Sequence, residues 1–303
     1  MENKKIGLPA QILQNKTSVG LVCDEGGDLP KEIIEKYQIT IVPFKVDLGQ
    51  MKDIPGNVYQ KIREAEKKGI KSFVKTSQPS PGDFLAVFKE RLRKFEEIIC
   101  VTITSKHSGT FNSAYQAREF LAEKERIHVL DSLSGSGGEG LIILKIASLI
   151  EKRLKIREIL EKARGAISNT NLIFMLEDPK WLEASGRISS VLATWLRGMQ
   201  KIGIRPLLGT KNGLITPVGI VKGVKDIASA LFKEFEKRIS RVKTTEKIKV
   251  VVTHCDNLKE TKKLIGMIEK LKNCEVVFIN LVGNILGGLA GPGASALAWQ
   301  IPC

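Results

Sequence analysis

The chain has 303 residues, 43% of them apolar and 27% charged, which is typical of a folded globular protein and excludes a disordered or fibrous class. This length suggests two domains. The formal net charge of +15 permits contact with nucleic acid or an anionic membrane. No nucleic-acid-binding motif accompanies it and only 6% of the residues are aromatic, so we expect no nucleic-acid partner.

The sequence carries no obvious membrane or export signal. The longest apolar run, at residues 141–150, is interrupted by Lys145 and is shorter than the roughly 20 residues of a membrane span. The first residues show no signal-peptide pattern. The five cysteines form no C-x-x-C pair, which favours buried, reduced thiols. We therefore expect a cytoplasmic protein.

Strand-like apolar runs alternate with helical patterns from about residue 19 onward. In the first half these runs lie at residues 19–23, 39–46, 98–104 and 127–130. Their spacing predicts βαβ units and a Rossmann-like parallel sheet. The segment Ser80-Pro81-Gly82-Asp83 predicts the start of a helix, because a serine cap, a proline at the first helical position and an acidic residue follow one another.

A long helical stretch at residues 138–168 leads into a second half with its own strands. Strand-like runs lie there at residues 171–176, 214–221, 247–255 and 274–280, and helical stretches lie at 224–241 and 257–272. We predict an α/β fold of two domains. The N-terminal α/β domain takes residues 1–168, including an extension of residues 1–18, and the C-terminal α/β domain takes residues 169–303.

Four expected junctions are rich in serine, threonine and glycine. In an open α/β sheet, ligands bind beyond the carboxyl ends of the strands, where loops enter helices. Helix N-termini offer unpaired N–H groups and a partial positive charge, and hydroxyl groups add donors. Capping alone would explain any single junction, but four in one chain favour a shared anion-binding site. They lie at residues 72–83, 104–110, 130–140 and 288–296.

Two other chemistries are minor alternatives. Residues 135–140 match the glycine pattern of a dinucleotide site, but the first glycine lies about five residues beyond the strand and a helical stretch stands where the second strand should be. Ser108, His107 and Asp131 could supply the nucleophile, base and orienting acid of a serine hydrolase. No G-x-S-x-G elbow accompanies them.

Several segments together resemble the DegV family, the bacterial fatty-acid-binding proteins that serve as the substrate-carrying subunit of fatty acid kinase. The resemblance covers nearly the whole chain from about residue 19, and the TSQPSP and Ser-Gly-Thr segments are its most specific parts. The segments are CDEGGDLP (23–30), IVPFKV (41–46), TSQPSPGDF (76–84), TSKHSGTFNSA (104–114), DSLSGSGGEG (131–140), LEASGRISS (182–190), GIRPLLGTKNGLITPVGIVKG (203–223), VTHCDN (252–257) and GPGASAL (291–297).

The resemblance implies two α/β domains with a long-chain fatty acid between them, its carboxylate at the interdomain cleft and its acyl chain in an apolar tunnel mainly in the C-terminal domain. Thr76 and Ser108 are the implied carboxylate ligands, Ser77 and Ser105 are close enough in sequence to assist, and Gly109 belongs to the same turn. Neutral hydroxyl donors satisfy a buried carboxylate without neutralising it. The absence of arginine from these loops suits a protein that presents the acid for phosphorylation.

The resemblance also implies the partners. We expect a binding protein that is not itself an enzyme, with the fatty acid as its ligand and no cofactor or metal. The ATP-binding subunit of fatty acid kinase would phosphorylate the bound acid, and the acyl-phosphate would pass to a membrane acyltransferase. Arg187, Lys201 and Arg205 lie in stretches that resemble the family's basic partner-facing surface. The basic excess would favour transient contact with an anionic membrane.

The chain departs from the family pattern in the two loops expected to meet the carboxylate. The C-terminal loop, with Leu289 and Gly291, has leucine where the family commonly has a histidine, and His107 stands where the family usually has leucine. We hypothesise that His107 supplies the lost N–H donor while Leu289 fills apolar space. The alternatives are a surface-exposed His107 with the third donor missing, or a changed head-group preference.

Further departures leave other ligands open. The usual T-D-S is Cys23-Asp24-Glu25 here, and Glu139 stands at a position that is usually apolar. An additional acid near the head group would repel an anion. His254 matches the family's histidine after the late strand, in a ligand-binding or a structural role. The chain could therefore be a divergent lipid-binding or small-acid-binding protein that does not support phosphorylation.

Overall fold

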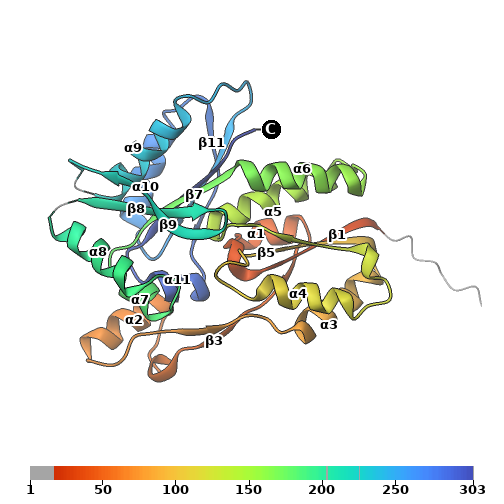
Figure 1. Ribbon diagram of the computed structural model, residues 1–303, viewed down its shortest axis with the longest axis horizontal. Coiled ribbons are helices and arrows are strands. Elements are labelled where there is room, and N and C mark those ends of the chain that lie inside the picture. Colours follow the sequence, from red (N-terminus) through yellow and green to blue (C-terminus); the bar gives the residue numbers. More distant parts are fainter. Residues whose placement is uncertain (1–16, 203, 225, 303) are drawn as a thin grey trace, which may run out of the picture.

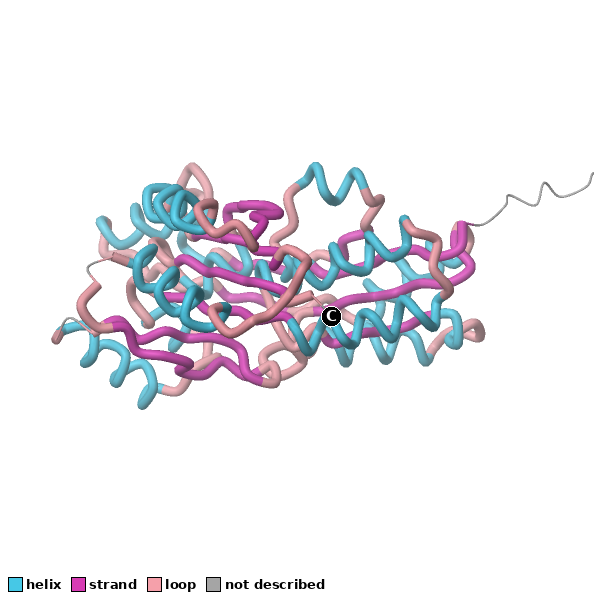
Figure 2. The backbone as a smooth tube through the Cα atoms, turned by 90° about the horizontal axis from the view of Figure 1, so that it is seen from above, coloured by secondary structure: helices cyan, strands magenta, loops and turns pink. Residues whose placement is uncertain are grey.

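The computed structural model describes residues 17–202, 204–224 and 226–302. The expected N-terminal extension therefore lies almost wholly outside the described residues, as does Cys303. Figure 2 shows the strands as two groups along the long axis of the molecule, with helices on both sides. No helix within the described ranges is both long and apolar enough to cross a membrane.

The N-terminal sheet has four parallel strands in the order β2-β1-β5-β6. Strands β1 and β5 are labelled in Figure 1. The prediction of a parallel sheet in the first half is confirmed. Successive side chains of a strand point to opposite faces, so alternate residues meet different helices. The strands are β1 (Thr17–Asp24), β2 (Thr40–Val42), β5 (Phe95–Thr102) and β6 (Ile127–Asp131).

Helices cover both faces of this sheet. On one face, Phe84 and Phe88 of α3 pack against Val22, Ile98 and Cys100. The predicted start of α3 is confirmed, because Ser80 and Asp83 each accept a hydrogen bond from the other's backbone N–H. The helical segments of this half are η1 (Glu25–Gly27), α1 (Lys31–Lys36), α3 (Pro81–Leu92), α4 (Thr110–Glu119), η3 (Lys124–Arg126), α5 (Ser136–Glu151) and α6 (Ile156–Asn169).

The apolar run 39–46 is not one strand. It ends in the sheet at Val42, and after Pro43 the chain forms β3 (Lys45–Asp47), which pairs antiparallel with β4 (Lys75–Ser77). Proline has no N–H to donate and interrupts the ladder. The segment between these strands holds η2 (Gly49–Met51) and α2 (Val58–Lys67). It crosses to the other half of the molecule, where Tyr59 donates a hydrogen bond to the Val282 carbonyl at 2.6 Å.

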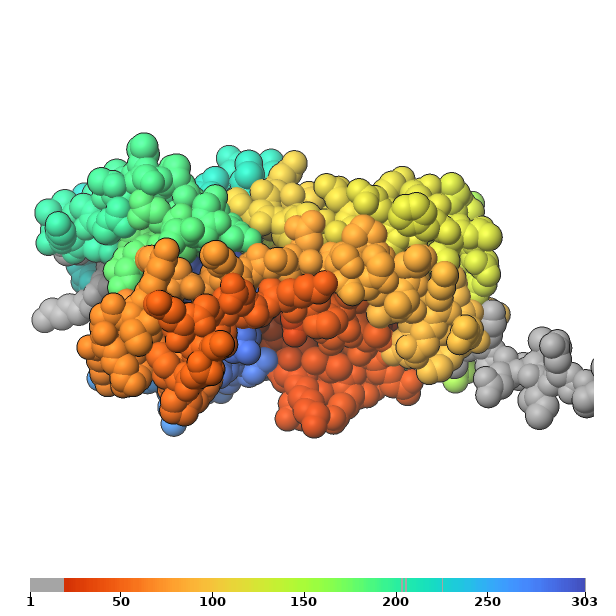
Figure 3. Space-filling view, turned by 90° about the horizontal axis from the view of Figure 1, so that it is seen from below, coloured from red at the N-terminus to blue at the C-terminus, as the bar shows by residue number. Residues whose placement is uncertain are grey.

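Figures 1 and 3 show this crossing. The orange ribbon of α2 lies beside α7 and α11, and the orange surface borders the green one.

The C-terminal sheet has six strands in the order β11-β10-β12-β7-β8-β9, and β12 runs antiparallel to both of its neighbours. Its strands are β7 (Thr170–Met175), β8 (Arg205–Lys211), β9 (Leu214–Val221), β10 (Ile248–His254), β11 (Cys274–Leu281) and β12 (Ser295–Gln300).

Helices α9 and α10 cover one face of the C-terminal sheet. Three other helices, α7, α8 and α11, belong to the same half of the molecule. Phe235 of α9 meets Trp299 of β12 edge to face, with ring centroids 5.3 Å apart. Strands β8 and β12 were not predicted, whereas the other four fall on predicted runs. The helices are α7 (Lys180–Ala184), α8 (Ser190–Lys201), α9 (Ile227–Ile239), α10 (Leu258–Ile268) and α11 (Asn284–Ala290).

Helix α5 joins the two sheets. Ile142 and Ile146 pack against the N-terminal sheet, while Leu141 and Leu144 pack against β7, β10 and β12 of the other sheet. A helix that meets a sheet on each side needs apolar residues all round, which explains the run at 141–150. The stretch 138–168 is thus two helices, α5 and α6, separated by a turn in which Arg153 has a φ of 56°. Helix α6 ends at Asn169 and β7 begins at Thr170, next to the boundary that we propose at 168/169.

Candidate ligand-binding site

A cavity of about 150 Å³ lies between the loops of the N-terminal sheet and the inner face of the C-terminal sheet. Most of its wall is hydrocarbon. Ala296, in the central strand β12, retains partial exposure because its side chain faces this space. The apolar part, which we call the cavity body, comprises Leu172, Phe174, Leu176, Leu182, Cys255, Val282, Ile285, Leu286, Leu289, Ala290, Ala294 and Ala296.

One end of the cavity is polar. A hollow of about 310 Å³, here called the vestibule, shares five lining residues with the cavity and adds Gln78, Lys106, Gly109, Ser185 and Gly186. The shared residues, which we call the mouth, are Phe44, Thr76, His107, Ser108 and Arg187. The arrangement is that of an apolar chamber with a polar entrance, which suits an amphipathic molecule with one charged end.

Thr76 and Ser108 come together at the mouth although they lie on different elements. Thr76 is in β4, and Ser108 immediately precedes Gly109, the cap residue of α4, which has no side chain to donate or accept. The Ser108 hydroxyl accepts from the Thr110 N–H at 3.3 Å and lies 2.7 Å from the Thr110 hydroxyl. Two predicted site residues therefore lie at one entrance, beside a helix N-terminus that favours an anion.

Ser77 and Ser105 do not line the cavity or the vestibule. Ser77 is exposed, because neighbouring residues of a strand point in opposite directions. The Ser105 N–H donates to both carboxylate oxygens of Asp131 at 3.2 Å. The structure therefore corrects the expectation that these two serines assist. Gly109 does reach the vestibule, where its N–H donates to the Gln78 side chain at 3.2 Å.

His107 faces the mouth and is not a surface histidine. Its Nε2 accepts a hydrogen bond from the Ile215 N–H at 2.8 Å. Burial lowers the pKa of His107, and the nearby charge of Arg187 lowers it further. The ring is therefore neutral near pH 7, and because Nε2 is an acceptor, the ring proton is on Nδ1. His107 thus has an N–H donor that the contact with Ile215 does not use.

Arg187 also lies at the mouth. Its guanidinium donates to the Ser185 carbonyl at 2.9 Å and lies 3.4 Å from the Thr76 hydroxyl. Burial lowers its pKa. No carboxylate pairs with it among the described residues. The head-group loops themselves contain no arginine, but Arg187 reaches the mouth from the segment after α7. Its role toward a partner stays a prediction.

Known proteins that resemble this chain identify its family. The DegV family profile, described as "Uncharacterised protein, DegV family", matches residues 18–301. The chain belongs to the DegV family. It is 30% identical over 301 residues to the fatty acid-binding protein of Thermotoga maritima, covering 93% of this chain and 98% of that one. It is 26% identical to the protein DegV of Bacillus subtilis over 291 residues, covering 93% and 99%.

Solved structures of DegV family proteins share the fold. A DegV family protein from Thermus thermophilus, whose structure is titled for fatty acid binding, aligns with a TM-score of 0.82 at 23% identity and covers 94% of this chain and 100% of that one. The fatty acid kinase B3 protein of Streptococcus pneumoniae, loaded with linoleic acid, aligns with a TM-score of 0.76 at 22% identity and covers 94% and 100%. These likenesses confirm two α/β domains.

The segment GPGASAL (291–297) follows the end of a helix. This corrects the expectation that residues 288–296 form a junction at the start of a helix. Helix α11 ends at Ala290, and Gly291 follows with a φ of 77°. A side chain on Gly291 would collide with the Trp181 ring. Leu289 is buried in the cavity wall. His107 and Leu289 therefore line the same cavity, which is necessary if His107 replaces the family histidine missing at position 289. The donor role of His107 stays a prediction.

Glu139 does not reach the ligand cavity. It is fully buried beside Asp24, whose carboxylate accepts from the N–H groups of Gly26 at 2.7 Å and Ile103 at 2.9 Å. Burial, together with the neighbouring acids Asp24 and Asp28, raises the pKa of Glu139 well above its usual range. Burial likewise raises the pKa of Asp24 to about 7. A protonated Glu139 outside the cavity wall adds no charge that would repel an anion.

The minor alternatives lack the geometry they need. Asp131 accepts from the N–H groups of Ser105 and Leu133, and His107 Nε2 is occupied by Ile215, so the residues of the expected hydrolase triad bond elsewhere. In the segment 135–140, a side chain on Gly137 would collide with Val251 and one on Gly140 with the Gly27 carbonyl. These glycines allow α5 to pack closely, which explains the pattern without a nucleotide.

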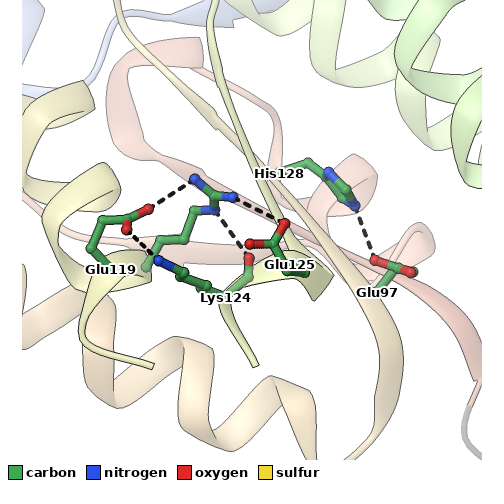
Figure 4. Close-up of polar contacts among 6 residues, drawn as sticks. Glu97, Glu119, Lys124, Glu125 and His128 are labelled. Carbon is green, nitrogen blue, oxygen red and sulfur yellow. Dashed lines mark hydrogen bonds and ion pairs between the residues drawn. The ribbon is translucent and has the colours of Figure 1, made fainter. Parts of the chain in front are cut away.

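His254 and Lys201 do not line the cavity or the vestibule. His254 Nδ1 accepts from the Asn257 N–H at 3.2 Å, which supports a structural role. His128 pairs with Glu97 at 2.9 Å, near a surface cluster of Glu119, Lys124 and Glu125 (Figure 4). Lys201 is exposed at the end of α8, and the side chain of Arg205 lies outside the described part of the chain. The described residues contain no cluster of three or more metal-ligating side chains.

Proposed function

We propose that this protein binds a long-chain fatty acid with its carboxylate at the mouth and its acyl chain in the cavity body, and presents it to a separate kinase subunit for phosphorylation. The observation that carries the proposal is the division of one cavity into an apolar body and a polar mouth. The fatty acid-binding protein of Thermotoga maritima, at 30% identity over nearly its whole length, supports the ligand class.

The mouth has the donors that a carboxylate requires. A buried carboxylate is costly unless both oxygens are hydrogen-bonded. Thr76 and Ser108 offer hydroxyl groups, His107 offers Nδ1–H, and the N-terminus of α4 offers a partial positive charge. Arg187 adds a charged donor within reach of Thr76. Each contact of this kind to a charged group contributes about 1.5–3 kcal/mol.

The vestibule supports presentation of the acid. It lies outside the mouth, is lined by polar residues and includes Lys106 and Arg187. A phosphoryl group that approaches the carboxylate from this side would meet two cations, which stabilise the charge that develops during phosphoryl transfer. The likeness of fold to the fatty acid kinase B3 protein of Streptococcus pneumoniae points in the same direction. The chain itself would act as carrier, and ATP would bind to its partner.

Native mass spectrometry of the purified protein tests the binding step. We expect a bound mass equal to that of a C14–C18 fatty acid, which organic extraction removes. Adding ATP and a bacterial fatty acid kinase subunit to the loaded protein should then convert that ligand to its acyl-phosphate. A small polar acid as the only ligand would contradict the proposal, and a fatty acid that stays unphosphorylated would restrict it to storage or transport. Delivery to an acyltransferase at an anionic membrane is a further part of the proposal, supported by the net charge of +15.

A further inference from the structure

A second group of polar side chains lies in the cavity wall and does not line the vestibule. We call it the inner polar cluster, and it consists of Ser134, Ser136 and Thr253, at the start of α5 and in β10. All three are more than nine-tenths buried. The wall beside them is apolar and includes Leu172 and Phe174. An unsubstituted acyl chain would offer these hydroxyl groups no partner.

Ser134 is the member whose hydroxyl is unexplained. Its Oγ is buried and makes no hydrogen bond. The loop does not need this hydroxyl, because the Ser134 N–H donates to the Ser132 hydroxyl at 3.2 Å and the Ser134 carbonyl accepts from the Thr104 N–H at 2.9 Å. Leaving a buried hydroxyl unpaired costs about 1–3 kcal/mol. A ligand atom that pairs with Ser134 would recover that energy.

Thr253 provides an acceptor in the same cavity wall. The Ser136 hydroxyl donates its one proton to Asp28 at 2.7 Å, so the proton in its 2.8 Å contact with Thr253 must come from Thr253. The lone pairs of the Thr253 oxygen are thus left to accept. The cluster also lies at the N-terminus of the 16-residue helix α5, whose cap residue Gly135 has no side chain. First-turn N–H groups without a side-chain cap can donate.

The charges around the cluster favour a neutral partner. Asp28 accepts from Ser136, and Asp24 and Glu139 are buried near the same turn of α5. Within the described part of the cavity wall, the only lysine or arginine is Arg187, at the mouth. A second anion would therefore be repelled. A group that accepts one hydrogen bond and donates another fits the available atoms, and the simplest such group on an acyl chain is a hydroxyl.

We propose that the inner polar cluster recognises a hydroxyl group on the acyl chain, so that the preferred ligand is a hydroxylated long-chain fatty acid. The ligand hydroxyl accepts from Ser134 Oγ and donates to Thr253 Oγ1. This inference rests on the proposed function, because the carboxylate at the mouth determines how far along the chain the hydroxyl must lie. One position of the hydroxyl will therefore fit the cluster better than the others.

The test compares stearic acid with its 3-, 6-, 10- and 12-hydroxy derivatives by calorimetric titration of the delipidated full chain. We expect at least one isomer to bind about tenfold more tightly than stearic acid, as one additional buried hydrogen bond predicts. Ser134→Ala should remove that gain and leave stearic acid binding unchanged. Ser113→Ala, at a buried serine of α4 outside the cavity wall, is the matched control and should retain the gain.

The remaining outcomes each overturn the inference. If every isomer binds no more tightly than stearic acid, the cluster serves water or packing. If Ser134→Ala weakens stearic acid as much as the hydroxylated acids, Ser134 belongs to the carboxylate site. If neither stearic acid nor any derivative binds the wild-type chain, the proposed function fails and this inference falls with it. Thr253→Val, which removes the acceptor, should abolish the same gain if Ser134→Ala does not fold.

Discussion

The mouth and the body of the cavity are built in different ways. The mouth depends on a few polar side chains from loops and strand ends, and each has a definable partner, such as Ile215 for His107 or Thr76 for Arg187. The body depends on many apolar side chains from β7, β12, α7, α11 and neighbouring loops, none of which carries a charge. Head-group chemistry should therefore respond to single substitutions at the mouth, and chain binding should respond to volume in the body.

The largest expected effect is a loss of volume in the body. Ala296→Trp places a large ring in the cavity between Thr253 and Phe174, its neighbours across the sheet. We expect affinity for oleic acid to fall about 100-fold or more, because a close-packed wall cannot move aside without strain. Titration with oleic acid measures this, and circular dichroism checks the fold. Ala122→Trp, at an exposed position, is the control, and equal affinities of the two variants would contradict the assignment of the body.

Removal of the charge at the mouth should have the next largest effect. Arg187→Ala should weaken oleic acid binding about tenfold, since a charged hydrogen bond in a half-buried site contributes about 1.5–3 kcal/mol. Lys201→Ala changes the same net charge on the exposed end of α8 and should leave affinity within twofold. If both variants lose affinity equally, long-range charge would explain binding better than a contact at the mouth.

His107→Leu should have a smaller effect, about threefold at pH 7, because the neutral ring contributes one hydrogen bond. The sign of the pH dependence is definite. The pKa of His107 is lowered in the free protein, and a bound carboxylate would raise it, so wild-type affinity should increase as the pH falls toward 6. The variant should lack this increase. If His107→Leu and wild type show the same affinity at pH 6 and 8, the exchange with Leu289 would be disproved.

Glu139→Gln should leave binding unchanged and alter stability instead. The folded-state pKa values are raised to about 7 for Asp24 and Asp28, and the pKa of Glu139 is also raised, so the folded chain holds protons which the unfolded chain releases above about pH 4. The free energy of unfolding should therefore fall as the pH rises from about 4 to about 7. The variant should show a shallower fall and a gain of about 1–2 kcal/mol at pH 8.

Urea unfolding at pH 5, 6, 7 and 8 measures that stability. Glu151→Gln, at the exposed end of the same helix, is the matched control and should follow the wild-type pH profile. A Glu139→Gln profile parallel to that of wild type would mean that Glu139 does not share in the titration of the acid cluster.

The sequence predicted the parts of the site that depend on short motifs. The segments that hold Thr76 and Ser108 were found because a Ser/Gly/Thr-rich strand-to-helix junction has a local physical reason to bind an anion. The resemblance to the DegV family singled out these two residues within them. The place of Arg187 at the mouth was not predicted, because its approach to Thr76 joins positions 111 residues apart. Only the tertiary fold determines such a contact. The resemblance to the DegV family in LEASGRISS was a signal that could have directed attention to it.

Strands rich in β-branched residues were predictable from the sequence. Strands that are short or consist of small residues were not. Strand β12 has the sequence SALAWQ and follows a Gly-Pro-Gly segment, so its composition suggested a loop, yet it lies between β10 and β7 at the centre of the sheet. Its small residues suit a strand that faces a cavity on one side. The crossing of α2 to the C-terminal half was not predictable, since nothing local shows which core Tyr59 will join.

The most direct test of a carboxylate held at the mouth compares oleic acid with methyl oleate. The wild-type chain and the double variant Thr76→Ala/Ser108→Ala are each titrated with both ligands. We predict that the variant loses about 30-fold in affinity for the acid and less than threefold for the ester, because only the acid places a charged group at these hydroxyls. Equal losses for both ligands, or no loss for the acid, would contradict the orientation on which the account depends.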